Sequence, residues 1–274
     1  MNRSQPSSDP KVFEAEMREA LCEVGRRVWQ REYIASNDGN FSVRLESDRI
    51  LATPTMVSKG FMLPDELPVV TLDGHQLSGP LRVTSEVKAH LEIYRLRPDV
   101  RAVVHVHPPH ATAFAVARKP LPKCILPEIE LFLGEIPLTS YATPGTDEFA
   151  ATLRPYLAKH NAFVLTNHGA LTVGGDPFEC YYRMETLEQY CRILLLAASL
   201  GGWQQISEAQ AMELLRLREK LGVVDRRLET NECLCSTGVP PVQGFKDDHR
   251  EAQQMESLID DITSRVLQAL RRSR

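Results

Sequence analysis

The sequence predicts a single α/β domain with appendages. Its 274 residues, 43% of them hydrophobic and 25% charged, provide enough material for one large core. Short apolar runs with strand character are interspersed with longer segments whose apolar residues recur at helical spacing. The sequence contains no internal repeat and no low-complexity segment. Together these patterns indicate one mixed core of helices and strands.

Composition also narrows the class of protein. A formal net charge of −4 argues against a nucleic-acid binder, because such proteins usually carry a basic excess. Residues 1–10 are polar and lack the apolar core of a signal peptide, so we expect a disordered tail. The longest apolar run, Ile193 to Leu200, is too short to cross a membrane. We therefore expect a cytoplasmic protein whose six scattered cysteines are reduced thiols.

Helix and strand signals follow one another along the first half of the chain. Asp9 and Pro10 predict the start of a helix that runs to about Arg31. A glycine-containing turn then opens a strand in which Phe41, Val43 and Leu45 alternate. Thr84 is expected to cap a helix that ends at about Arg97, before Pro98. Further short strands are predicted at 50–56 and 69–74, and the apolar run 101–107 is predicted to form a buried strand.

The second half of the chain also contains both helix and strand signals, and it ends in a predicted linker and a predicted C-terminal helix. A helix is expected from about Pro109, short strands or loops at 131–133 and 136–138, a helix at 147–160, strands at 162–166 and 170–173, and helices at 177–199 and 207–221. Residues 231–246 contain Pro240-Pro241 and are predicted to form a loop or linker. Residues 247–274 place apolar side chains on one helical face, which predicts a C-terminal amphipathic helix.

Two histidines in the apolar strand suggest a metal site. His105 and His107 lie two residues apart, so both imidazoles project from one face of a strand. Taken alone, such a pair fits simple packing, but two titratable groups in an apolar strand are costly unless they are paired or ligated. Glu86 can add a carboxylate and His168, in the turn Asn167-His168-Gly169, a third imidazole. Three nitrogens and one oxygen suit zinc or another divalent ion.

The start of the predicted helix at Thr84 suggests an anion site. Thr84, Ser85 and free backbone amides form a natural phosphate cradle, because unpaired N–H groups and the positive end of the helix dipole favour an anion. Glu86 in the same turn would also be commonplace as a solvated acidic residue. His110 is interpreted as packing or as support behind the metal ligands. His75, His90, His160 and His249 are expected at the surface, and Cys233-Leu-Cys235 lacks the pattern of a zinc site.

Five motifs together carry a resemblance to a known family. They are Asn37-Asp-Gly-Asn-Phe-Ser42, Thr53-Pro-Thr55, Thr84-Ser-Glu86, His105-x-His107 and Asn167-His-Gly169. Their order and spacing are similar to those of the class II aldolase/adducin family, over about residues 12–200. The resemblance implies a three-layer α-β-α sandwich with a central, mainly antiparallel sheet. It also implies a homotetramer with active sites at subunit interfaces, and we assign residues 11–230 to the catalytic domain.

The resemblance further implies roles for individual residues. The zinc ligands of the family match Glu86, His105, His107 and His168, and its phosphate-binding positions match Asn40, Thr55, Thr84 and Ser85. Glu86 is implied as the base beside the substrate carbonyl, and Tyr141 as an acid that serves a neighbouring subunit. Met56 stands where the aldolases of the family usually have glycine, and Thr84 replaces the commoner serine. No tyrosine follows Tyr190, whereas these aldolases carry one in a mobile C-terminal tail.

The activity implied is that of a class II aldehyde-lyase. We expect zinc-dependent cleavage of a ketose or deoxyketose 1-phosphate to dihydroxyacetone phosphate and an aldehyde. A sugar-phosphate 4-epimerase of the same family is an alternative, although the epimerases have aspartate where this chain has Glu86. Decarboxylases of oxo-tetronate phosphates have the same glutamate, so this activity is a further alternative. An adducin-like structural protein without metal is the alternative outside enzymes.

Overall fold

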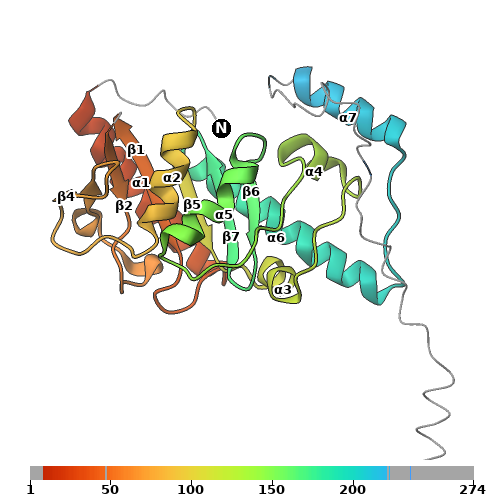
Figure 1. Cartoon of the computed structure of the whole chain (residues 1–274), viewed down its shortest axis with the longest axis horizontal. Helices are drawn as coiled ribbons and strands as arrows, with labels where there is room; N and C mark the ends of the chain where they lie inside the picture. Colours follow the sequence, from red (N-terminus) through yellow and green to blue (C-terminus); the bar gives the residue numbers. More distant parts are fainter. Residues whose placement is uncertain (1–8, 47, 221, 223–234, 236–274) are drawn as a thin grey trace, which may run out of the picture.

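The computed structural model describes residues 9–46, 48–220, 222 and 235. Residues 1–8 of the expected tail, the C-terminal helix predicted at 247–274, and all of the predicted linker 231–246 except Cys235 lie outside the described residues. The described part forms one mixed α/β body in three layers, as expected (Figure 1).

The middle layer is a 7-stranded sheet in the order β4-β3-β2-β1-β5-β7-β6, with every neighbouring pair antiparallel. The strands are β1 (Asn40–Glu46), β2 (Arg49–Ala52), β3 (Val69–Val70), β4 (Gln76–Ser78), β5 (Ala102–Val106), β6 (Ala162–Leu165) and β7 (Gly169–Gly174). The strand that carries the histidines, β5, lies between β1 and β7 near the centre of the sheet. Its five residues are all buried, so its polar side chains must be paired within the protein.

Helices cover both faces of the sheet. One apolar core contains buried residues of α1 (Pro10–Gln30), α3 (Pro109–Ala117) and α6 (Pro177–Ser199), with Val104 and Val106 of β5. The other contains residues of α2 (Val87–Leu96) and α5 (Asp147–Leu157), with Val103. Because side chains alternate along a strand, His105 faces the second core with Val103. The site is therefore built on the side of the sheet that α2 and α5 cover.

Most predicted elements are confirmed, and the exceptions have local causes. Residues 131–133 lie in or directly after the short helix α4 (Pro127–Phe132) and form no strand. Pro127 at the first helical position and the acidic residues of the first turn favour that helix. Helix α2 begins at Val87, with Glu86 rather than Thr84 as its N-cap residue. The strand β4 and two short 3-10 helices, Lys59–Phe61 and Pro64–Glu66, had no clear sequence signal.

Helix α7 (Glu208–Lys220) contacts α4, and both lie at the end of the molecule opposite β4 (Figure 1). The expectation that all six cysteines are reduced thiols is wrong, because Cys124 and Cys235 form a disulfide. Cys124 is buried beside Ala211 and Leu215 of α7, which brings the two sulfurs together in an apolar contact. Cys22, Cys180 and Cys191 are buried free thiols, as predicted. None of the helices within the described residues is long and apolar enough to span a membrane.

We expect the Cys124–Cys235 disulfide to stabilise the protein, because it closes a loop with a sequence separation of 111. Such crosslinks typically contribute about 2–4 kcal/mol. Peptide mapping without reductant should recover the crosslinked pair, and dithiothreitol should lower the thermal unfolding midpoint. The control is the double variant Cys124→Ser/Cys235→Ser, whose midpoint should not respond to dithiothreitol. An equal response of wild type and double variant would contradict the stabilising role.

Candidate active site

Three histidines converge at the edge shared by β5 and β7. His105 lies on β5, His107 directly after it, and His168 in the turn that precedes β7. The ring centroids of His105 and His168 are 4.6 Å apart, and that of His107 lies 5.0 Å and 4.9 Å from them. One nitrogen from each ring lies within 4.8 Å of the others, so the cluster has the spacing of a metal site. The sequence therefore identified three residues that the fold brings together.

Glycine in the turn after His168 explains how the rings approach so closely. A Cβ atom at Gly169 would lie 2.5 Å from Cδ2 of His107 and 2.6 Å from the carbonyl oxygen of Val106. Both distances are far shorter than a van der Waals contact, so any larger residue would push the turn away from β5. The glycine therefore permits the close approach of the two backbone segments.

The hydrogen bonds and burial of the rings suit metal binding. Nδ1 of His105 lies 2.8 Å from the carbonyl oxygen of Ala170, which can only accept, so Nδ1 carries the proton. The lone pair on Nε2 of His105 is then left to face Nε2 of His107, 3.2 Å away. Burial lowers the pKa of His168 to about 3, and burial together with the nearby His107 lowers the pKa of His105 well below its ordinary value. Neutral imidazoles with converging lone pairs are the form that binds metal ions.

Two carboxylates border the three histidines. The oxygens of Glu86 lie 3.4 Å from Nε2 of His105 and 3.6 Å from Nε2 of His168. Glu86 is thus adjacent to the cluster, and its role as the fourth ligand stays a prediction. Asp38, which sequence reasoning did not single out, has Oδ2 3.4 Å from Nδ1 of His107. A carboxylate behind a ligating imidazole orients the ring and raises its basicity.

Backbone pairing brings the predicted anion-binding residues to the same region. The amide of Thr53 donates to the carbonyl of Phe41, and the amide of Thr84 donates to the carbonyl of Thr53. This pairing places the segment of Thr55 between β1, which begins at Asn40, and the start of α2. Asn40 is also the register partner of His105 across β1 and β5. Asn40 therefore lies opposite His105, and Thr84 and Ser85 directly precede Glu86, while the contact of all four residues with phosphate stays a prediction.

Met56 adopts a backbone conformation that glycine would adopt without strain. Its φ is +59°, in the left-handed region, and its side chain is 79% exposed. For a residue with a Cβ atom this conformation costs about 1–2 kcal/mol. The amide nitrogen of Asn37 lies 3.6 Å from the Met56 sulfur, a contact between the two loops that border the site.

A buried lysine lies beneath these loops. Nζ of Lys59 donates to the carbonyl oxygens of Asn37, at 3.0 Å, and Val57, at 2.5 Å, so it links the loop before β1 to the loop after Thr55. The side chain is almost fully buried, and burial lowers its pKa to about 8 although Asp38 and Glu86 oppose the shift. No sequence motif marks this lysine as part of the site.

Tyr141 is not part of the histidine cluster. It is 56% exposed, on the loop before α5. The same loop packs against the start of α2, since a Cβ atom at Gly145 would lie 3.2 Å from the carbonyl oxygen of Ser85. Tyr141 is therefore accessible on the surface, on a loop that approaches Ser85 at Gly145, and its catalytic role stays a prediction.

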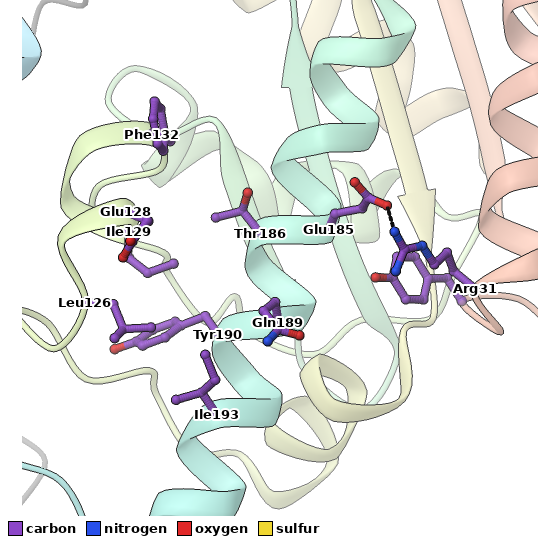
Figure 2. Close-up of a pocket in the computed structure, with 11 residues that line it drawn as sticks. Arg31, Leu126, Glu128, Ile129, Phe132, Glu185, Thr186, Gln189, Tyr190 and Ile193 are labelled. Carbon is purple, nitrogen blue, oxygen red and sulfur yellow. Dashed lines mark ion pairs between the residues drawn. The ribbon is translucent and has the colours of Figure 1, made fainter.

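A separate cavity of about 610 Å³ lies between α4 and α6 (Figure 2). Figure 2 shows the ion pair of Arg31 and Glu185 at one end and Ile129 and Phe132 of α4 at the other. None of the predicted site residues lines it. Tyr33 connects the two regions, because it lines the cavity while its carbonyl oxygen accepts from the amide of His107.

A sheet between helical layers, with three clustered histidines spaced as in a metal site, defines an α/β protein with a candidate metal centre. Residues 19–195 match the family model of the Class II Aldolase and Adducin N-terminal domain. The chain therefore belongs to the class II aldolase/adducin family, as the motifs predicted.

Relatives within the family carry more than one activity. The chain is 32% identical over 215 residues to 3-oxo-tetronate 4-phosphate decarboxylase of Escherichia coli K12, which covers 77% of the chain and 99% of the relative. It is also 32% identical over 173 residues to L-fuculose phosphate aldolase of Methanococcus maripaludis strain S2, which covers 63% of the chain and 93% of the relative.

Solved structures with a similar fold are likewise described with more than one activity. An L-fuculose 1-phosphate aldolase superposes with a TM-score of 0.69 at 25% identity, covering 76% of the chain and 96% of that structure. Escherichia coli YgbL, described as a candidate aldolase, epimerase or decarboxylase, gives 0.69 at 30% identity, covering 73% of the chain and 98% of that structure. The fold and family are shared, and the particular reaction must be argued from the site.

Removal of one imidazole should abolish tight metal binding. Loss of partners behind a ligand already weakens metal affinity about 10–100-fold, so His105→Ala or His107→Ala should weaken zinc binding by about 100-fold or more. The measurement is elemental analysis after dialysis, together with competition against a chromogenic chelator. His75→Ala, at an exposed position, is the matched control. Wild-type protein that binds no stoichiometric divalent metal would exclude the metal site.

Lys59 should make stability depend on pH in the alkaline range. Its pKa of about 8 in the folded protein lies below the ordinary value of 10.5. Between these values the unfolded chain binds more protons, so the contribution of Lys59 to stability rises with pH. Urea unfolding of wild type and Lys59→Met at about pH 8 and about pH 10 should show wild type gaining relative to the variant. A difference independent of pH would contradict the lowered pKa.

Proposed function

We propose that this chain is a zinc-dependent aldehyde-lyase. It cleaves a ketose or deoxyketose 1-phosphate reversibly to dihydroxyacetone phosphate and an aldehyde, as an L-fuculose 1-phosphate aldolase does. One observation carries the proposal: the Glu86 carboxylate lies 3.4 Å and 3.6 Å from two of three clustered imidazoles, at the helix start that holds Thr84 and Ser85. The proposed metal site and the proposed anion site therefore meet in the segment Thr84-Ser85-Glu86.

The proposed phosphate anchor consists of Asn40, Thr55, Thr84 and Ser85. Ser85 is exposed beside the buried Thr84, so the Ser85 hydroxyl can reach an anion bound at the start of α2. With phosphate held there, the carbonyl carbon two bonds away would lie toward His105, because Asn40 and His105 are register partners. An anion site directly before Glu86 in the chain favours a 1-phosphate of a ketose, in which one carbon separates the phosphate from the carbonyl.

The proposed chemistry divides between the metal and the protein. Zinc, when bound by His105, His107 and His168, would act as a Lewis acid on the carbonyl oxygen. Glu86 would move the proton at the carbon next to the carbonyl, which gains a proton when the C–C bond breaks. Tyr141, from a neighbouring subunit, would act as the acid that protonates the aldehyde oxygen in the condensation direction; in cleavage its phenolate would accept the proton lost by the hydroxyl group that becomes the aldehyde. One proton is taken up and one released, so the cleavage is balanced.

A decarboxylase of 3-oxo-tetronate phosphates is the second candidate. The specific observation in its favour is the length of the match, since the alignment to the Escherichia coli decarboxylase covers 99% of that protein. Decarboxylation of a 3-oxo acid also breaks a C–C bond beside a carbonyl, so the same imidazoles and Glu86 would serve it. The 4-epimerase alternative is less favoured, because Glu86 replaces the aspartate expected there. The adducin-like alternative predicts a protein without bound metal.

The proposed assembly is a homotetramer in the cytoplasm, with active sites at subunit interfaces. Tyr141 is exposed in the single chain, which suits a residue that acts across an interface. Light scattering should then give four times the chain mass of 30.9 kDa.

The proposed function is tested by one panel of reactions. Metal-loaded protein is assayed for dihydroxyacetone phosphate release from ketose 1-phosphates and for carbon dioxide release from a 3-oxo-tetronate 4-phosphate. Glu86→Gln should lose about 100-fold or more in turnover, because a proton-transfer group typically contributes about 10²–10⁴-fold. His75→Ala is the control. Full activity of Glu86→Gln would exclude its assigned role, and carbon dioxide release alone would favour the second candidate.

A further inference from the structure

The helix that covers the site carries a histidine that was expected at the surface and is in fact fully buried. His90 on α2 is 1% exposed, and that expectation is wrong because α2 packs this face against β1. The Nε2 atom of His90 lies 2.6 Å from Oδ1 of Asn40, and its Nδ1 atom lies 2.6 Å from Oγ of Ser42. Each ring nitrogen therefore has a hydrogen-bond partner, and the two partners, Asn40 and Ser42, lie on the same strand, β1.

The chain of hydrogen bonds continues to a second residue of α2. Oγ of Ser42 lies 2.8 Å from the hydroxyl oxygen of Tyr94. Tyr94 and Ser42 are both buried to within 1% exposure or less. Four polar side chains thus form a buried line from Tyr94 through Ser42 and His90 to Asn40, in a region otherwise filled by the apolar core.

The direction of donation along this line is fixed at its Tyr94 end. In the described part of the structure the Tyr94 hydroxyl has no hydrogen-bond partner other than Ser42, and burial raises its pKa, so it keeps its proton. A buried hydroxyl that failed to donate would cost free energy, so Tyr94 donates to Ser42. Ser42 must then donate to Nδ1 of His90, and Nε2 of His90 donates to Asn40.

His90 can act in this way because it is neutral. Burial lowers its pKa to about 3, so at physiological pH one ring nitrogen donates and the other accepts. The oxygen of the Asn40 amide accepts the proton of Nε2, which fixes which way the amide group points. Its Nδ2 group has no partner within the described residues and is left free to donate to a ligand.

Asn40 presents this amide group beside the metal cluster. It is the register partner of His105, and directly opposed residues of neighbouring strands project from the same face of the sheet. An N–H donor at this point suits an anionic oxygen, and an amide turned the other way would present a carbonyl that repels it.

We propose that His90 is a positioning residue that orients the Asn40 amide for a phosphate group, with Ser42 and Tyr94 fixing its donor direction. This inference rests on the proposed function in one respect, that Asn40 contacts the phosphate. His90 itself does not touch substrate.

The test uses zinc-loaded full-length protein and inorganic phosphate as the probe, with binding measured by calorimetry. Asn40→Ala and His90→Leu should each weaken phosphate binding about tenfold, the effect of losing or misdirecting one hydrogen bond to a charged group. The double variant should bind no more weakly than Asn40→Ala alone, because His90 acts only through Asn40. Bound zinc should stay stoichiometric in all three.

Two milder variants keep the test valid if His90→Leu does not fold. Tyr94→Phe removes only the hydroxyl that sets the direction of hydrogen-bond donation through Ser42 to His90. This variant should bind phosphate more weakly, and the ¹⁵N chemical shifts of His90 should show a mixture of its two tautomers. His90→Gln keeps a side-chain donor, and should restore part of the affinity that His90→Leu loses. A merely structural role would move thermal stability without moving the tautomer or the phosphate affinity.

The outcomes separate the two proposals. If Asn40→Ala binds phosphate as wild type does, the phosphate anchor of the proposed function fails. If Asn40→Ala weakens binding while His90→Leu and Tyr94→Phe do not, the anchor stands and the positioning role of His90 is overturned. Additive losses in the double variant would likewise overturn it.

Discussion

Burial of polar groups at the centre of an apolar sheet is the constraint on which the rest of the site depends. His105 lies on β5 between β1 and β7, where every residue of the strand is buried. A buried polar group is tolerated only if each hydrogen-bonding atom has a partner or a ligand. His105 satisfies this at Nδ1 through the carbonyl oxygen of Ala170, and its Nε2 atom faces the other imidazoles, where a metal ion would be its partner. The close approach of the turn at Gly169 follows from the same need.

The same constraint explains why the site extends through α2. Asn40 and Ser42 alternate with Phe41 on β1, so both polar side chains point toward α2 rather than into solvent. Helix α2 provides their hydrogen-bond partners, His90 and Tyr94, which are four residues apart and therefore lie on one helical face. Lys59 meets a similar need beneath the neighbouring loops, where two backbone carbonyls accept from its ammonium group. Polar partners thus hold in place the residues that border the histidines.

Sequence patterns were sufficient for the parts of the fold that depend on local signals. The helices α1 and α6 have capping residues and a first-turn proline, and both begin where those signals predicted. The three histidines could be grouped because each lies in or beside an apolar run. Asp38, Lys59 and His90 could not be found in this way, because their environments are set by contacts between segments distant in sequence. The disulfide of Cys124 was missed for the same reason, since its partner lies 111 residues away.

The two candidate reactions differ in what they require at one oxygen atom. Both break a C–C bond beside a carbonyl and leave electrons there, so the roles proposed for the histidines and Glu86 are the same in either reaction. In aldol cleavage the departing fragment is an alcohol that must lose a proton to become an aldehyde, whereas carbon dioxide departs without such a loss. A proton acceptor at that oxygen is therefore needed only by an aldolase. Tyr141 is the residue proposed for that position, and its exposed loop is held against Ser85 at Gly145. Under the proposed mechanism, the identity of the reaction thus depends on the loop of Tyr141 more than on the histidine cluster.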